Sequence, residues 1–299
     1  MANALAQPVI ALPGVVSEVR RAPRLWDRFL RQPTAVIGLA LLLAVASVAL
    51  LAPWLAPGDP LIGAGLPLQP PSTDHWLGTD DLGRDILVQL LHGARVSLFV
   101  GLAVAVIATL VGTLVGALSG FFGRWVDDGL MRLTEFVLVL PRFFLAIIVT
   151  TFFGGSLLNI VLLLGLTFWP STARLLRAQI LSLREREFVV AARAVGATES
   201  AILTRQVLPN AMPPVLVNAS LQVGGAILIE AGLSFLGLGD RSQVSWGYML
   251  NSAQPFILIA WWMSIFPGLA LLLTVIAVNL VADGLNEAWS PQPSDEAWR

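Results

Sequence analysis

The sequence predicts an all-α integral membrane protein with six transmembrane helices. The chain has 299 residues, a mean hydropathy of +0.79 and only 12% charged residues. A water-soluble core cannot hide that much apolar surface. A helix needs about 20 apolar residues to cross roughly 30 Å of hydrocarbon. Six runs reach that length, at residues 34–54, 98–121, 130–153, 157–176, 214–236 and 256–282.

The arginines orient these helices. All 18 basic residues of the chain are arginine. If the N-terminus lies inside the cell, fourteen of them fall in cytoplasmic segments and three, Arg84, Arg95 and Arg241, in external segments. Arg142 alone falls within a predicted span. Because basic residues concentrate in cytoplasmic loops, we expect both termini to lie in the cytoplasm.

The bulk composition excludes several kinds of partner and site. A net charge of −1 gives no basic surface for nucleic acid, and a cysteine count of zero excludes disulfides, thiolate metal sites and S-acylation. The first 33 residues are polar and rich in arginine, and Pro53 and Pro57 disfavour cleavage after the first span. We therefore expect the first span to remain as an anchor.

The chain divides into an N-terminal arm, one membrane domain and a tail. Residues 1–33 form a cytoplasmic arm, in which RLWDRFLRQP places Trp26, Phe29 and Leu30 at helical spacing and predicts a short interfacial helix. Residues 34–290 form the six-helix domain, which has an external segment at 55–97 and a cytoplasmic loop at 177–213. Residues 291–299 form a cytoplasmic tail.

The external segment is expected to end in a helix that runs into the second span. Turn-forming residues dominate the first half of HWLGTDDLGRDILVQLLHGARVSL. Asp81 or Asp85 is placed to cap a helix. Farther along, Gly112, Gly116 and Gly120 recur every four residues, which predicts a groove for close approach of a neighbouring helix. The capped helix carries one apolar stripe, made of Ile86, Leu87, Leu90, Leu91 and Ala94.

Histidines and aspartates lie close together in the external segment, but they do not predict a metal site. The spacing of His75 and His92 matches neither a calcium-binding loop nor a zinc-binding helix. We expect the charged residues to shape turns and helix caps at the external mouth. The mouth residues are Asp80, Asp81, Arg84, Asp85 and Trp246.

Three ionisable residues, Glu135, Arg142 and Glu230, lie inside predicted spans. Each is expected to face protein or water, because a charge in hydrocarbon is costly. Glu135 precedes Arg142 by about two turns, and Pro141 between them predicts a kinked or broken third span. Arg142 either pairs with Glu135 or meets a group on another molecule, and Glu230 is expected to join the fifth span to its neighbours.

The stretch EREFVVAARAVGATESAILTRQVLPN, residues 185–210, is too polar to cross a bilayer. It predicts two short helices joined at Gly196, the second capped by Thr198 and ended by LPN at Pro209. Two interpretations remain open, an amphipathic loop resting on its own membrane domain or a docking element for a cytosolic partner. Apolar residues recur in both helices, at Phe188, Ala191, Ala192, Val195, Ile202, Leu203 and Val207.

The same stretch resembles the cytoplasmic signature of bacterial ABC-importer permeases. That signature is Glu-Ala-Ala, three residues, Gly, nine residues and Ile-x-Leu-Pro, and it forms the loop that docks on the ATPase. Here Val190 replaces the glutamate and Gln206 the isoleucine, whereas the matching residues are Ala191, Ala192, Gly196, Leu208 and Pro209.

Further segments resemble the second permease subunit of dipeptide, oligopeptide and nickel importers. They are HWLGTDDLGRD, GARVSL, EAGLSFLGLG, SWGYML and FPGLALLLTVIAVNLVADGL. Their order is that of the family, and the resemblance extends from about residue 26 to residue 291. It implies a type I ABC-importer permease fold with six transmembrane helices, in the cell membrane of a bacterium.

The resemblance also implies partners. A homologous second permease would complete a translocation path for peptides, above all dipeptides, and an extracytoplasmic binding protein would deliver them. One or two ATPase subunits would bind ATP and Mg²⁺. This chain would bind no cofactor and is not expected to be an enzyme, since it has no G-x-x-x-x-G-K-[ST] motif. The residues expected to couple to the ATPase are Val190, Ala191, Ala192, Gly196, Ala197, Leu208 and Pro209.

The resemblance gives the span residues candidate roles as well. Glu135, Pro141, Arg142 and Glu230 are candidates for the translocation path or its gate. Arg142 is placed either to attract the carboxylate of a passing peptide or to pair with Glu135 or with a carboxylate of the second permease.

Two rival functions compete with this interpretation. A proton-coupled secondary transporter would use Glu135, Arg142 and Glu230 as a relay, but no inverted repeat is evident. An intramembrane hydrolase would need a serine and a histidine within a span, and both histidines lie outside the spans.

Overall fold

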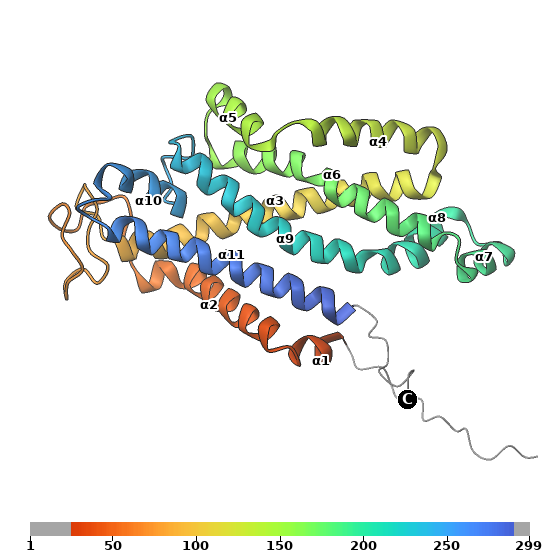
Figure 1. Cartoon of the computed structure of the whole chain (residues 1–299), viewed down its shortest axis with the longest axis horizontal. Coiled ribbons are helices and arrows are strands. Elements are labelled where there is room, and N and C mark those ends of the chain that lie inside the picture. Colours follow the sequence, from red (N-terminus) through yellow and green to blue (C-terminus); the bar gives the residue numbers. More distant parts are fainter. Residues whose placement is uncertain (1–24, 290–299) are drawn as a thin grey trace, which may run out of the picture.

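The computed structural model describes residues 25–289, which form a bundle of long helices (Figure 1). Within that range five helical segments are long and apolar enough to cross a membrane, and one bent pair provides a sixth. The predicted all-α membrane fold is confirmed. The helices are α1 (Leu25–Leu30), α2 (Pro33–Leu55), α3 (Ile86–Phe122), α4 (Arg124–Val139), α5 (Arg142–Phe153), α6 (Leu157–Leu183), α7 (Glu187–Ala194), α8 (Glu199–Ile202), η1 (Leu203–Val207), α9 (Leu208–Phe235), α10 (Trp246–Ala253), η2 (Gln254–Phe256) and α11 (Trp262–Trp289).

The third predicted span consists of two helices, α4 and α5, that are bent by 79° relative to each other. Pro141 accounts for the break, because a proline disfavours helical backbone angles at the preceding residue. Leu140 accordingly has extended backbone angles, φ −71° and ψ 122°. With 16 and 12 residues, neither helix reaches the length needed to cross alone. The break predicted from Pro141 is therefore confirmed.

The prediction that LPN ends a helix at Pro209 is wrong, because the chain continues through α8, η1 and α9 as one helical path. A proline has no N–H, so it removes one hydrogen bond from a helix. The π-helical turn η1 precedes Pro209 and shifts the hydrogen-bond partners, with the Leu208 N–H donating to the Leu203 carbonyl. Pro209 follows this π-helical turn, in the first residues of α9.

α3 and α6 pack closely along the predicted glycine groove. A Cβ atom added at Gly112 would lie 2.5 Å from the Cβ of Thr172, and one added at Gly116 would lie 2.6 Å from the carbonyl oxygen of Ala173. Gly120 continues the same contact one turn farther along. No side chain fits in so small a gap, so the glycines allow the two backbones to approach.

Gly116→Ala is expected to lower the free energy of unfolding by about 1–3 kcal/mol, because the added methyl group meets backbone that cannot move without shifting α6. The thermal unfolding midpoint in detergent measures the change. Gly129→Ala in α4 is the control, since nothing lies within 4 Å of its added Cβ. That control should stabilise α4 by about 0.5–1 kcal/mol. Equal midpoints for the two variants would contradict the close packing of α3 and α6.

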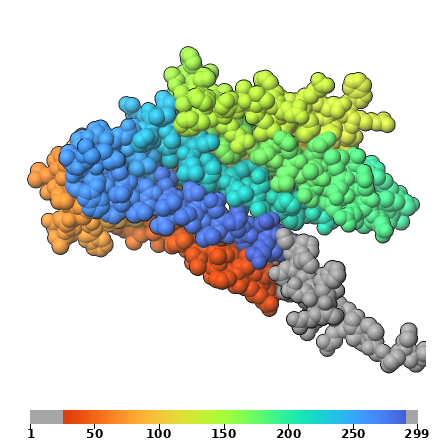
Figure 2. Space-filling view, in the orientation of Figure 1, coloured from red at the N-terminus to blue at the C-terminus, as the bar shows by residue number. Residues whose placement is uncertain are grey.

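The two ends of the bundle carry different segments (Figure 1). The external segment and α10 gather at one end, and α1, α7, α8 and the C-terminal end of α11 gather at the other. Figure 2 shows the same division, with α4 and α5 as a ridge along one side. The segments predicted to be external and those predicted to be cytoplasmic therefore lie at opposite ends.

The short helix predicted in the N-terminal arm is present as α1. Phe29 is buried and packs against Ala288 at the end of α11, whereas Trp26 is exposed. α1 is thus fastened to the bundle by one face. The first 24 residues of the arm and the predicted tail lie outside the described residues.

Candidate functional site

The loop between α6 and α9 has an inward and an outward apolar side. Val189 and Ala192 belong to a buried cluster that includes Ile180 of α6. On the outward side, Val190 and Val195 are 57% and 86% exposed. The interpretation of this segment as a loop resting on its own domain accounts for the inward side only. The outward side is a small apolar surface on a helix that the bundle holds in place.

The turn after α7 has the geometry that the sequence predicts. Gly196 has a φ of +82°, in the region that favours glycine, and the Thr198 hydroxyl accepts a hydrogen bond from the Ala201 N–H at 3.4 Å. Arg193 and Glu199 form a fork across the turn, with Nε 2.9 Å from Oε1 and Nη2 3.0 Å from Oε2. The fork ties the end of α7 to the start of α8.

The residues predicted to couple to an ATPase form two groups, one packed against the bundle and one exposed. Ala192 is buried, and Ala197 and Leu208 are half-buried against the same cluster. These three hold the loop on the bundle. The others face outward and are free to meet another protein, namely Val190, Ala191, Gly196 and Pro209.

The helical path from α8 to α9 joins this loop to the far end of the bundle. It runs unbroken over 37 residues, Glu199–Phe235. Ile202, Val207 and Ala211 hold its first turns on the cluster that also contains Val189 of α7. α7 and the first turns of this helical path are therefore packed in one cluster.

At the far end of α9, Glu230 fastens α10 to the bundle. Glu230 is 2% exposed, and its Oε1 accepts hydrogen bonds from the hydroxyls of Ser234 at 2.7 Å and Ser245 at 2.8 Å. The Ser245 hydroxyl also caps the N-terminus of α10. Beside it, the buried indole of Trp246 donates to the Leu90 carbonyl of α3 at 3.0 Å. The expectation that Glu230 joins the fifth span to its neighbours fits these contacts.

The charged residues that the sequence predicts at an external mouth are held by hydrogen bonds. Oδ1 of Asp80 accepts from the Arg84 N–H at 2.8 Å, and its Oδ2 accepts from the Gln89 amide at 2.8 Å. Of the two aspartates proposed to cap α3, Asp85 does so, and its second oxygen lies 2.8 Å from Nδ1 of His75. These side chains fix the turns that precede α3.

Two further contacts complete the mouth. The Arg84 guanidinium donates to the Tyr248 hydroxyl at 2.9 Å and so joins the external segment to α10. Asp81 lies half-buried beside these groups, and burial raises the pKa of its carboxyl. The mouth residues predicted from the sequence thus come together at one end of the bundle.

The structure does not bring the charged span residues into contact. The Arg142 guanidinium lies over the ring of Phe168 in α6, 4.6 Å from its centroid. Glu135 is exposed on α4. Among the described residues, no ion pair within 4 Å joins Arg142 to Glu135.

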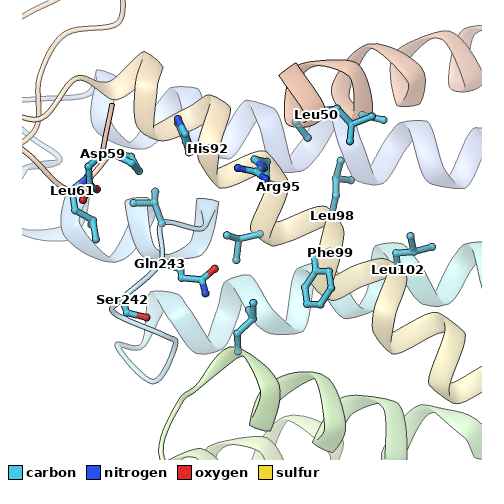
Figure 3. A pocket seen from close by; sticks show the side chains of 16 residues that line it. Leu50, Asp59, Leu61, His92, Arg95, Leu98, Phe99, Leu102, Ser242 and Gln243 are labelled. Carbon is cyan, nitrogen blue, oxygen red and sulfur yellow. The ribbon is translucent and has the colours of Figure 1, made fainter. Parts of the chain in front are cut away.

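A cavity of about 770 Å³ opens near the outer end of α2 and α3, beside the loop that precedes α10. Figure 3 shows Asp59 and Leu61 at one end of it, Arg95 in the middle, and Leu50, Phe99 and Leu102 at the other end. Sequence reasoning missed this cavity, because its walls come from segments that are far apart along the chain.

Comparison with known proteins identifies the family of this chain. Residues 112–293 match the family described as binding-protein-dependent transport system inner membrane component. The chain belongs to that family of permeases. Residues 23–71 of the permease also match the N-terminal transmembrane domain of oligopeptide transport permease C.

Two curated relatives of the permease match over most of their length. The di/tripeptide transport system permease protein DppC of Pseudomonas aeruginosa is 39% identical over 280 residues, which cover 91% of this chain and 92% of that protein. The dipeptide transport system permease protein DppC of Alkalihalophilus pseudofirmus is 38% identical over 260 residues, which cover 86% of each chain. The resemblance found in the sequence is confirmed. The permease is a multi-pass inner membrane component rather than a catalytic subunit, and the matches give no support to a proton-coupled secondary transporter.

One ion pair of the permease could not be predicted from the sequence. Arg177 in α6 and Asp127 in α4 form a fork in which Nε to Oδ1 and Nη2 to Oδ2 are both 2.6 Å. The Ser119 hydroxyl of α3 donates to the same carboxylate. The three side chains join three helices at the end that carries α7. Because Asp127 and Arg177 are separated by 50 residues, only the fold reveals the pair.

Asp127→Asn is expected to lower the free energy of unfolding by about 1.5–3 kcal/mol, since the amide keeps one acceptor but loses the charge and the fork. Thermal unfolding in detergent measures this change. The neighbouring Asp128 is exposed, so Asp128→Asn should change stability by less than about 0.5 kcal/mol. A similar loss in both variants would show that the fork contributes nothing.

Proposed function

We propose that the permease is the membrane subunit of an ATP-driven importer of short peptides, above all dipeptides. The cargo is supported by the two relatives, which are named as dipeptide and di/tripeptide transport permeases. In this proposal a homologous second permease completes the translocation path. One or two ATPase subunits bind ATP and Mg²⁺, and an extracytoplasmic binding protein delivers the peptide. The permease itself holds no cofactor.

The end of the bundle that carries α7 is assigned to the cytoplasm, with both termini of the chain. The distribution of arginine supports this assignment, because fourteen of the 18 lie in the arm, loops and tail that would then be cytoplasmic. The external segment and α10 accordingly face the binding protein. The residues proposed to meet it are Asp80, Asp81, Arg84, Asp85 and Trp246.

The outward side of α7 is the observation that carries the proposal. Val190, Ala191 and Gly196 expose small groups that fit a cleft on an ATPase, in the manner of a helix bound in a groove. Valine at position 190 makes this contact hydrophobic rather than ionic. The inward residues Ala192, Ala197, Leu208 and the outward Pro209 belong to the same coupling element.

Coupling requires a two-state element that a ligand at a distant site can bias. ATP binding would bring the ATPases together and move α7 with them. Because α8, η1 and α9 are continuous, the motion would reach Glu230 and α10 at the outer end. We assign Glu135, Pro141, Arg142 and Glu230 to the path or its gate.

Purification of the full-length chain from its native membrane in mild detergent tests the proposal. Mass spectrometry should identify a second permease and ATPase subunits in the preparation. In proteoliposomes loaded with ATP, uptake of labelled dipeptide supplied with its binding protein should persist when the proton gradient is collapsed. Uptake should stop when ATP is omitted. A chain that purifies alone and transports dipeptide without ATP would overturn the proposal.

A further inference from the structure

The cavity beside α2 and α3 has its apolar and charged groups in a fixed order (Figure 3). Arg95 lies one helical turn farther out on α3 than Phe99. Asp59, in the segment after α2, lies beside Leu61 at the end of the cavity opposite Leu50, Phe99 and Leu102. Apolar surface, a cation and an anion therefore follow one another from the membrane outward. The apolar surface is made of Leu50, Leu98, Phe99 and Leu102.

Both charged side chains are free to bind a ligand. Arg95 is exposed, and within the part of the chain that the structure describes its guanidinium makes no hydrogen bond or ion pair. Oδ1 of Asp59 accepts from the Leu61 N–H at 2.8 Å, which leaves Oδ2 for another donor. His92 is occupied, since its Nε2 lies 3.0 Å from the Ala56 carbonyl and must donate to it.

We propose that this cavity binds a phospholipid of the outer leaflet whose headgroup carries a primary ammonium. A phospholipid presents an acyl chain, a phosphate and a terminal headgroup in that order. The acyl chain would lie along Leu98, Phe99 and Leu102, and the phosphate would accept charge-assisted hydrogen bonds from Arg95. The ammonium would donate to Asp59. The cavity volume of about 770 Å³ falls within the range of about 300–1,000 Å³ typical of small-molecule sites.

A dipeptide cargo matches this order less well. Its ammonium and carboxylate stand at opposite ends with the side chains between them, so it needs an anion and a cation on either side of apolar surface. Here Arg95 and Asp59 both lie to one side of the apolar surface made by Leu50, Leu98, Phe99 and Leu102, and only Leu61 lies beside Asp59. The lipid site therefore goes beyond the proposed function, and it depends on neither the cargo nor the ATPase.

The test titrates the full-length permease, with the subunits that accompany it, with three phospholipids that share the same acyl chains. Native mass spectrometry counts bound phosphatidylethanolamine, phosphatidylcholine and phosphatidylglycerol. Phosphatidylethanolamine should bind tightest. Arg95→Gln should weaken its binding about tenfold, as expected for the loss of a charge-assisted hydrogen bond. Asp59→Asn should remove the preference over phosphatidylcholine, whose quaternary ammonium has no N–H to donate.

Two further variants sharpen the test. Ala46 is half-buried in the apolar part of the cavity, and Ala46→Phe should weaken all three phospholipids without changing a charge. Arg241 is external but does not line this cavity, so Arg241→Gln should leave binding unchanged. Equal binding of the three phospholipids, or unaltered binding after Arg95→Gln, would overturn the proposal. Displacement of the lipid by dialanine would also overturn it and would assign the cavity to the cargo path.

Discussion

Replacement of Gly196 by tryptophan is expected to abolish ATP-coupled uptake while the chain still inserts and folds. Gly196 is exposed, and nothing in the permease lies within 4 Å of a Cβ atom added there. The indole would therefore project into the space that an ATPase would occupy in the proposed complex. Loss of a central contact of about 3 kcal/mol would weaken docking roughly 100-fold. Uptake of labelled dipeptide, normalised to the amount of permease in the membrane, measures the effect.

Two variants separate the steric effect from other effects of this substitution. Because Gly196 has a φ of +82°, any side chain there strains the backbone by about 1–3 kcal/mol. Gly196→Ala carries that strain without the bulk and should keep most of the uptake. Gly129→Trp adds the same bulk on α4, at a glycine that also has open space around it. If Gly196→Trp and Gly129→Trp transport equally well, the turn after α7 is not the docking surface.

Local signals explain what the sequence predicts correctly. The spans follow from run length, because the bilayer thickness sets the number of apolar residues that a helix needs. The turn at Gly196 and the cap at Asp85 are decided by a few neighbouring residues and their backbone hydrogen bonds. The break at Pro141 is equally local, since a proline restricts the residue before it.

Features that depend on distant segments were beyond the sequence. The helix that continues through Pro209 is a local exception, because it depends on the adjacent π-helical turn η1, of which a proline alone gives no sign. The fork between Asp127 and Arg177 needs α4 and α6 to lie side by side. The sequence also does not show which of the residues predicted to couple to an ATPase face the bundle. Only the packed cluster shows that Ala192 faces inward and Val190 outward.

Glu230→Ala is expected to lower the free energy of unfolding by about 3 kcal/mol or more. Two buried hydroxyls, those of Ser234 and Ser245, would lose their acceptor, and each such loss costs about 1–3 kcal/mol. The deleted side chain would also leave a cavity, which adds to the cost. Thermal unfolding in detergent measures the total. Limited proteolysis between α9 and α10 should show that the connection to α10 has loosened.

Glu230→Gln distinguishes an anchor from a proton carrier. The glutamine keeps one carbonyl oxygen for Ser234 and Ser245, and the replaced Oε2 accepts no hydrogen bond among the described residues. The buried amide N–H groups find no acceptor there, which costs some stability, but Glu230→Gln should lose less stability and less dipeptide uptake than Glu230→Ala. A carboxyl that carried protons would instead lose its function in both variants. Recovery of uptake by glutamine would show that position 230 supplies a hydrogen-bonded joint between α9 and α10 and not a proton-carrying carboxyl, which is what the proposed transmission of motion from α7 to α10 requires.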